Sequence, residues 1–462
     1  MKTRILSGVL GLAVALPALA QAPAKEAPPA PGPAKPFALP QPQRFALGNG
    51  LRVTFVPYGS VPKVVVRLAV RSGNAFESKD EIWLADLAGK LMREATKTKD
   101  ATALSTEAAR MGGSLDVNVG EDRTLIGGEV LSEFAPDMVR LVADLSLNPT
   151  FPDSELARLK ADLARQLSLQ KSQPQPIAQE AFRKALYGDA AYGRMFPTPE
   201  QLQGYTAAQA RAFYERNSGA ARAHLFVVGR FDAAGVEKAV REAFAAMPKG
   251  TPAPSLDPKP HSERRIVLVD RPGAVQSTLV VGLPVVRPDD PEWIPLQVTH
   301  TLLGGYFSSR ITANIREQKG YTYSPFSQLS TRVRDAYWAQ NADVTTSVTG
   351  ASLKEIFGEI DRLQAEPPPA AELRAVQSYL GGTFVLQNSA RSGIVNQLLY
   401  LDLQGLGDEY LRSYVEKMNA VTPTQVSEMA RRHLRDDQMT IVVVGDRKAI
   451  EEQLKPYGPI VP

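Results

Sequence analysis

The pattern of hydrophobic positions between residues 44 and 247 predicts groups of strands interleaved with helices. Continuous apolar runs favour buried strands, and apolar residues at spacings of three and four favour helices with one buried face. The predicted strands cover residues 52–56, 63–70, 114–119, 124–130 and 224–228. The predicted helices cover residues 82–98, 104–111, 134–146 and 154–171, and another starts near residue 177, after the breaker PQP at residues 174–176.

The same order begins again after residues 248–260 (PKGTPAPSLDPKP), which carry a high density of proline and glycine. Residues 265–269 (RIVLV) repeat 52–56 (RVTFV), and MTIVVV before Gly445 repeats HLFVV before Gly229 at nearly the same spacing. Such repetition predicts a duplicated α+β fold. We expect two α/β-sandwich domains, residues 44–247 and 262–462, joined by a linker at 248–261. Each is expected to be a mainly antiparallel sheet with helices packed on one face.

The first 43 residues have the pattern of an export signal followed by an extended leader. Lys2 and Arg4 precede an apolar run at residues 5–16, and ALA at residues 18–20 matches the A-x-A cleavage pattern. Residues 1–20 are therefore predicted to be a cleavable signal peptide, which favours the periplasm of a Gram-negative bacterium. Residues 21–43 are rich in proline and alanine and predict a semi-rigid leader. No stretch is long and apolar enough to span a membrane.

The length, charge and cysteine count of the chain exclude some classes of protein. The chain has 462 residues, which suits two domains near 200 residues each. Its net charge is only +4, and no block of Lys and Arg is interleaved with aromatic residues, so nucleic acid is not expected as a partner. The absence of cysteine excludes disulfides and a lipid-modified cysteine after the signal.

One predicted helix, residues 82–98 (IWLADLAGKLMREATKT), places Asp86, Gly89 and Lys90 within a single turn. The surrounding letters resemble the zinc helix of the pitrilysin / mitochondrial processing peptidase family, an inverzincin family with the motif H-x-x-E-H. On that pattern Asp86 replaces the first His, Gly89 the Glu and Lys90 the second His. The family's third zinc ligand is a Glu on a later helix, and Gln166 stands at the matching position.

These substitutions argue against a zinc site in this chain. Zn²⁺ needs His, Cys or carboxylate ligands, whereas the Lys90 ammonium has no lone pair at neutral pH. Gly89 has no side chain to act as a general base. We therefore expect Asp86 and Lys90 to form an i,i+4 ion pair on a solvated helix face. The resemblance then implies a family member with no cofactor and no activity of its own.

The second half retains a family feature. Residues 303–327 (LGGYFSSRITANIREQKGYTYSPFS) resemble the signature of the family's C-terminal domain, in which L-G-G-x-x-x-S-R is followed by an Arg and, seven residues later, a Tyr. Here these are Arg316 and Tyr323, which the resemblance implies contact the substrate backbone or a developing oxyanion. Guanidinium and phenol groups are suitable donors for such an oxygen. The alternative is that Arg316 is a solvated helix residue and Tyr323 a strand aromatic.

The resemblance implies a non-catalytic, substrate-binding subunit of an exported zinc metallopeptidase heterodimer that degrades peptides or unfolded proteins. The expected partner is a homologous catalytic chain that carries H-x-x-E-H and the zinc, and Arg316 and Tyr323 would complete its active site. A peptide-binding or scaffold protein without a peptidase partner is the alternative. No G-x-S-x-G elbow, P-loop or dinucleotide fingerprint is present. The four histidines have no second ligand at metal-like spacing: His224, His261, His300 and His433.

Overall fold

The structure, a computed structural model, describes residues 40–461. The predicted signal peptide and nearly all of the predicted leader lie outside the described residues. The first strand, β1 (Gln43–Ala46), begins at the last residue assigned to the leader. Within the described residues no helix combines the length and the apolar character needed to cross a membrane.

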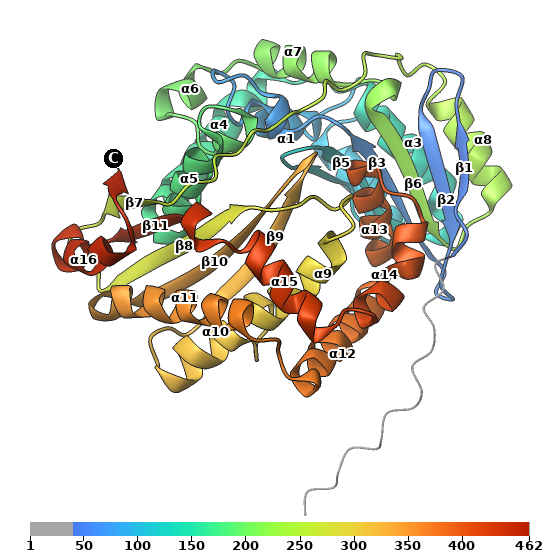
Figure 1. Cartoon of the computed structure of the whole chain (residues 1–462). Coiled ribbons are helices and arrows are strands. Elements are labelled where there is room, and N and C mark those ends of the chain that lie inside the picture. The colour runs from blue at the N-terminus through green and yellow to red at the C-terminus, as the bar shows by residue number, and fades with distance from the viewer. Residues whose placement is uncertain (1–39, 462) are drawn as a thin grey trace, which may run out of the picture. The chain divides into compact units, whose positions relative to one another are not determined.

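The first half of the chain forms a six-stranded sheet in the order β1-β2-β6-β3-β5-β4 (Figure 1). Neighbouring strands are antiparallel except for β2 and β6, which run parallel. After β1 the strands are β2 (Arg52–Pro57), β3 (Lys63–Val70), β4 (Asp116–Val119), β5 (Thr124–Leu131) and β6 (Ala223–Gly229). The helices are α1 (Leu84–Met92), α2 (Ala101–Arg110), α3 (Ala135–Leu147), α4 (Asp153–Ser172), α5 (Pro174–Tyr187), α6 (Pro199–Gly204), α7 (Ala207–Asn217) and α8 (Ala233–Ala243).

The second half forms a sheet in the order β12-β7-β11-β8-β10-β9. Its strands are β7 (Arg265–Asp270), β8 (Gln276–Pro284), β9 (Phe326–Arg332), β10 (Asp335–Thr345), β11 (Thr440–Gly445) and β12 (Ile460–Val461). The helices are α9 (Trp293–His300), α10 (Arg310–Thr312), α11 (Thr349–Ala365), α12 (Ala370–Gln387), α13 (Arg391–Gln404), α14 (Glu409–Asn419), α15 (Pro423–His433) and α16 (Arg447–Leu454). Two π-helical turns, η5 (Thr301–Gly305) and η6 (Ala313–Gln318), flank α10.

The two sheets repeat one topology, which confirms the predicted duplicated α+β fold. The order β2-β6-β3-β5-β4 recurs as β7-β11-β8-β10-β9, with the same parallel pair, β7 beside β11. Only the outermost strands differ in origin. β1 precedes its neighbour β2 and is antiparallel to it, whereas β12 comes from the end of the chain and lies parallel to β7.

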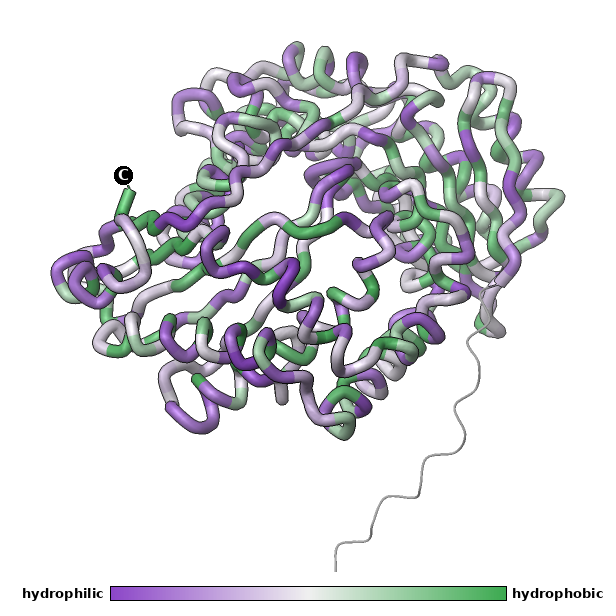
Figure 2. The backbone as a smooth tube through the Cα atoms, in the orientation of Figure 1, coloured by the Kyte–Doolittle hydropathy of each residue, from purple (hydrophilic) through white to green (hydrophobic). Residues whose placement is uncertain are grey.

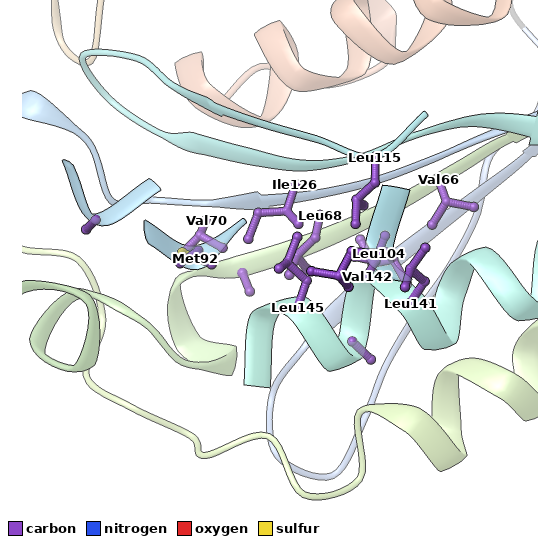
Figure 3. Packing of buried hydrophobic residues seen from close by; sticks show 14 of the residues in the cluster. Val66, Leu68, Val70, Met92, Leu104, Leu115, Ile126, Leu141, Val142 and Leu145 are labelled. Carbon is purple, nitrogen blue, oxygen red and sulfur yellow. The ribbon is translucent and has the colours of Figure 1, made fainter. Parts of the chain in front are cut away.

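Successive side chains along each strand point to opposite faces of the first sheet. Leu225 and Val227 of β6 belong to the main core with the helices of the same half, whereas His224 and Phe226 point to the opposite face. Figure 3 shows part of this core, in which residues of β3 such as Leu68 pack against α3. In Figure 2 the helices alternate between hydrophobic and hydrophilic residues, as expected when one face is buried.

The second face of each sheet is covered by a helix from the other half of the chain. Helix α5 packs on β8 and β11, with Phe182 and Leu186 fully buried against Val442 and its neighbours. Gly282 permits this contact, because a Cβ atom there would lie 2.7 Å from Cζ of Phe182. Helix α13, which occupies the equivalent place in the repeat, packs on β3 and β6 (Figure 1). The halves thus exchange one helix each.

The PQP sequence separates two helices as predicted, but the second helix includes it and begins at Pro174 rather than near residue 177. Helix α4 ends at Ser172, and α5 begins directly at Pro174. Proline is favoured in the first turn of a helix, because its fixed φ suits the helix and its missing N–H would have no partner there. The predicted breaker is therefore the start of the exchanged helix.

Candidate functional site

The start of α1 is organised by a buried acidic residue outside the helix. The Glu77 carboxylate accepts hydrogen bonds from the backbone N–H groups of Trp83 at 3.1 Å and Ala85 at 2.8 Å. The Asn74 amide donates to Glu77 at 3.2 Å and to Asp86 at 2.7 Å. Burial raises the pKa of Glu77 to about 8, against the pull of these donors. Asp86 is thus tied to the loop before α1.

The predicted ion pair between Asp86 and Lys90 is wrong. Their charged groups do not approach within 4.0 Å, and the Asp86 carboxylate binds Asn74 instead. Burial raises the pKa of Asp86, while the hydrogen bond from Asn74 and the charge of Lys90 act in the opposite direction. The face is not freely solvated, because both side chains are partly buried.

The surroundings of Gly89 do not fit a zinc peptidase centre. A Cβ atom on Gly89 would lie 2.6 Å from Cγ2 of Val119 and 3.4 Å from Cγ1 of Val117, both in β4. Gln166 is exposed on α4. The donor chemistry is also unsuitable, since an ammonium and a carboxamide replace an imidazole and a carboxylate. Among residues 40–461 no group of three or more His, Cys, Asp or Glu side chains is arranged to hold a metal ion.

In the second half, the structure brings Arg316 and Tyr323 together. Arg316 lies in η6, and its Cζ atom is 5.5 Å from the ring centroid of Tyr323 and 4.0 Å from that of Phe307. All three residues line a pocket of about 430 Å³, whose lining residues all fall between positions 304 and 326. We call this the Arg316–Tyr323 pocket.

The Arg316–Tyr323 pocket is open and aromatic. Tyr323 is 82% exposed, Phe307 69% and Phe326 52%. Clustered exposed aromatic residues of this kind are typical of binding sites. The Arg316 Nε atom is 3.4 Å from the exposed carboxylate of Glu317, and no acidic residue lines the pocket itself. The site therefore offers one stacked guanidinium and two phenols, those of Tyr306 and Tyr323, to a ligand.

The glycines of the LGG motif allow the wall of this pocket to pack closely. A Cβ atom on Gly304 would lie 2.6 Å from Oγ of Ser327, and one on Gly305 would lie 2.7 Å from Nε2 of His300. His300 Nδ1 is 3.0 Å from the same Ser327 hydroxyl. Burial lowers the pKa of His300 to about 4, so the imidazole is neutral beneath the pocket. Gly320 has a φ of +64°, which suits a turn.

A second polar cluster was not anticipated from the sequence. His224 Nε2 is 2.8 Å from the Thr54 hydroxyl, and His224 Nδ1 is 3.0 Å from Oδ1 of Asp402. Arg52 donates to the same Asp402 oxygen at 2.6 Å. An ionised carboxylate can only accept, so Nδ1 carries the proton and Nε2 accepts from Thr54. These four residues line a pocket of about 450 Å³.

The cluster joins the two halves. Thr54, His224 and Arg52 come from β2 and β6, whereas Asp402 comes from the exchanged helix α13. Burial lowers the pKa of His224, against the effect of Asp402. Burial disfavours the charge on Asp402, yet the hydrogen bond from His224 together with the charge and hydrogen bond of Arg52 brings the Asp402 pKa down to about 2. No sequence signal connects Asp402 to strands so distant in the chain.

A third contact joins the turns of two equivalent hairpins, β4–β5 and β9–β10. Arg332 of β9 is 4% exposed, and its Nε atom is 2.7 Å from the Glu121 carboxylate in the β4–β5 turn. Arg183 of α5 binds the other oxygen of Glu121 at 2.6 Å. The backbone N–H of Val333 donates to Asp122 at 3.3 Å. This buried network fixes the two hairpin turns against each other.

The duplicated fold, the zinc helix without ligands and the Arg316–Tyr323 pocket together define a metallopeptidase-like protein. Residues 56–200 match the insulinase family, peptidase family M16, and residues 204–380 match the peptidase M16 inactive domain. The chain belongs to peptidase family M16 and is related to zinc proteases.

Relatives and solved structures agree with this assignment. An uncharacterized zinc protease of Mycobacterium tuberculosis is 26% identical over 446 residues, which is 92% of this chain and 98% of the relative. One of Bacillus subtilis is 22% identical, over 86% of this chain and 96% of its own length. A peptidase M16 inactive domain from Pseudomonas fluorescens superposes with a TM-score of 0.81 at 23% identity, covering 88% of this chain and 98% of its own. A protease from Helicobacter pylori superposes with a TM-score of 0.82 at 18% identity, covering 88% of this chain and 100% of its own.

Proposed function

We propose that this protein is the non-catalytic, substrate-binding subunit of an exported zinc metallopeptidase heterodimer that degrades peptides or unfolded proteins. One contrast between the halves carries the proposal. The Arg316–Tyr323 pocket is open and intact, whereas Val119 fills the space beside Gly89 in the helix that would bear the metal. A chain that retains the donors and lacks the ligands needs a reacting centre supplied by another chain.

The pocket has the features needed to hold an extended peptide. The outer strand of the second sheet, β9, begins at Phe326 in the wall of the pocket. A peptide added to an edge strand is held through its backbone and therefore with little dependence on sequence. Arg316 is stacked on Phe307, which orients its N–H groups, and the exposed Tyr323 hydroxyl is a second donor. Both can bind a substrate carbonyl oxygen.

The expected partner is a homologous chain with H-x-x-E-H, which would hold the zinc for which residues 40–461 of this chain provide no group of ligands. Donors of this chain would then stabilise charge on the substrate carbonyl from the opposite side. Removal of one such donor lowers turnover by about 10²–10³ in well-studied hydrolases. The signal-like sequence at residues 1–20 supports export of this chain to the periplasm.

The test is peptidase activity of the reconstituted pair with wild-type and Tyr323→Phe subunits, measured at equal assembly. Tyr323→Phe removes one hydroxyl from an exposed ring, so folding and pairing should be preserved. We expect turnover to fall by at least about tenfold. Tyr457→Phe is the matched control, because the Tyr457 hydroxyl binds the Gly350 carbonyl far along the chain from the pocket. Unchanged turnover would make the Arg316–Tyr323 pair structural, and failure to recover any homologous partner would favour a plain peptide-binding protein.

A further inference from the structure

A second open pocket lies in the same half of the chain, among α9, β9, α12, α13 and α14. Its volume is about 340 Å³. None of its lining residues is acidic, basic or a histidine, although α12, α13 and α14 carry charged residues elsewhere. The lining consists of aromatic rings, carboxamides, hydroxyls and a few leucines. We call it the neutral pocket.

The aromatic residues of the neutral pocket form a continuous series. The ring of Tyr400 lies 6.0 Å from that of Tyr410, which lies 6.2 Å from that of Tyr414. Tyr414 stacks on Phe384 of α12 at 4.9 Å, and Trp293 of α9 completes the lining. Such a series offers several flat apolar surfaces for a chain of rings or apolar side chains.

The polar groups in this pocket are suited to backbone amides. The side-chain oxygen of Gln297 is buried and has no hydrogen-bond donor among the described residues. Gln387 and Asn396 place further carboxamides at the exposed rim. A carboxamide both donates and accepts, so it can pair with the C=O and N–H groups of a peptide. A buried acceptor without a donor is a site that a ligand N–H can satisfy.

Helix α12 connects the neutral pocket with the Arg316–Tyr323 pocket. Tyr306 lines the latter, and its ring is 5.2 Å from that of Tyr379 on α12. Tyr379, Thr383 and Gln387 follow at helical spacing along one face, and the last two line the neutral pocket. This stripe is about 12 Å long. An extended polyproline-type segment covers that distance with about four residues.

We infer that the neutral pocket binds uncharged, proline-rich or otherwise extended segments of the same peptide whose neighbouring residues occupy the Arg316–Tyr323 pocket. This inference rests on the proposed function and adds a substrate preference to it. A polyproline segment has no internal hydrogen bonds, so its carbonyls are free for Gln and Tyr donors while its rings pack on aromatic surfaces. A charged side chain would lose hydration here without gaining a partner.

Binding can be measured on the full chain without any partner. The probe is a fluorescein-labelled dodecamer of alternating proline and alanine with blocked ends. Its binding is measured by fluorescence anisotropy. We expect Tyr410→Ala to weaken binding by about tenfold or more, since it removes one ring of the series. Gln387→Ala, at the exposed rim, should weaken it by about threefold to tenfold. Gln166→Ala, an exposed glutamine of α4 in the other half, is the matched control and should bind like wild type.

A second readout keeps the test independent of folding defects. The emission of Trp293 should change when the probe binds, and Trp293→Phe should remove that change. Equal affinity for a dodecamer with glutamate at four alanine positions would overturn the inference, as would wild-type affinity in both pocket variants. Binding of a neutral oligosaccharide in place of the peptide would also overturn it. Because no partner is present, failure here leaves the activity test of the Tyr323→Phe pair unaffected.

Discussion

Cγ2 of Val119 lies 2.6 Å from the position that a Cβ atom on Gly89 would occupy. The helix that resembles the family's zinc helix therefore differs from it in packing as well as in the residues at the ligand positions. A neighbouring strand, β4, has packed its valines against the turn of α1 where the catalytic glutamate of an active relative would project. A side chain at position 89 therefore requires Val119 to shift.

This pairing predicts that Gly89→Ala lowers the free energy of unfolding by about 1–3 kcal/mol, because valine is stiff and cannot rotate away. Val119→Ala in the same chain should recover part of the loss. Urea unfolding of the two single variants and the double variant measures the coupling. The exposed Gln166→Ala should stay within about 0.5 kcal/mol of wild type. Additive losses in the double variant would show that the two residues do not compete for space.

The same region predicts the metal content of the purified protein. Asp86, Lys90 and Gln166 do not supply a set of zinc ligands, so the chain isolated alone should contain far less than one zinc ion and cleave no peptide. Elemental analysis after dialysis against a chelator-free buffer checks this. About one tightly held zinc per chain, retained through dialysis, would contradict it.

The histidines predict how stability depends on pH. His300 has a pKa of about 4 in the folded chain, below its ordinary value of 6.5. As pH falls below 6.5 the unfolded chain takes up a proton that the folded chain does not, so stability is fully present above 6.5 and declines toward pH 4. Burial lowers the pKa of His224 as well, which acts in the same direction.

His300→Asn isolates this contribution, because it keeps a polar group near Ser327 and removes the titration. The loss of unfolding free energy between pH 7 and pH 5 should be smaller by up to about 2 kcal/mol than in wild type. The comparison of two pH values cancels any constant packing loss. His261→Asn is the matched control, because His261 is exposed in the segment between the halves. A variant profile parallel to that of wild type would rule out His300 as the titrating group.

Local sequence patterns predicted strands such as β2, β3 and β6, which are largely apolar runs, whereas β1, β9, β10 and β12 were not predicted. Residues 63–70 were assigned as a strand with the bounds that β3 has. The repeated order of elements also predicted two copies of one sheet, and the topology confirms it. Arg316 and Tyr323 line one pocket because the residues of the LGG motif and those that follow it are close in sequence.

Features that depend on distant parts of the chain were not predictable in this way. The i,i+4 spacing suggested an ion pair between Asp86 and Lys90. The Asp86 carboxylate instead accepts a hydrogen bond from Asn74, which precedes α1. His224 looked isolated in the sequence because its partner Asp402 lies far along the chain, on α13, which packs on the first sheet. Pro174 was interpreted as a helix breaker because the local sequence does not distinguish a proline that ends one helix from a proline that begins the next.

The two exchanged helices make the last prediction, because both are docked by apolar burial but their ion pairs differ in exposure to solvent. Helix α5 is anchored by buried apolar side chains, among them Ala178, Phe182 and Leu186. Helix α13 also buries apolar side chains, among them Ile394 and Leu399. Its edges carry partly exposed ion pairs in addition, such as Asp402 with Arg52 and Arg391 with Glu129 at 3.1 Å. Exposed ion pairs are weakened by salt, whereas apolar burial is not.

Hydrogen exchange followed by mass spectrometry can compare the helices within one molecule. Raising the salt concentration to about 1 M should speed exchange in α13 and leave α5 unchanged or slower, since salt screens ion pairs but strengthens burial only slightly. Lowering the pH from 7 to 5 should not have this effect through Asp402, because a proton taken up at Nε2 of His224 disturbs the contact with Thr54 and leaves the Nδ1–H donor to Asp402 in place. Asp402→Asn should reproduce part of the effect at low salt and reduce the further response to salt, because the pair of Arg391 with Glu129 remains. Phe182→Ala is the complementary variant, and it should speed exchange in α5 with no dependence on salt. If both helices respond equally to salt, the exchanged helices are held by the same forces and the polar contacts of α13 contribute little to its docking.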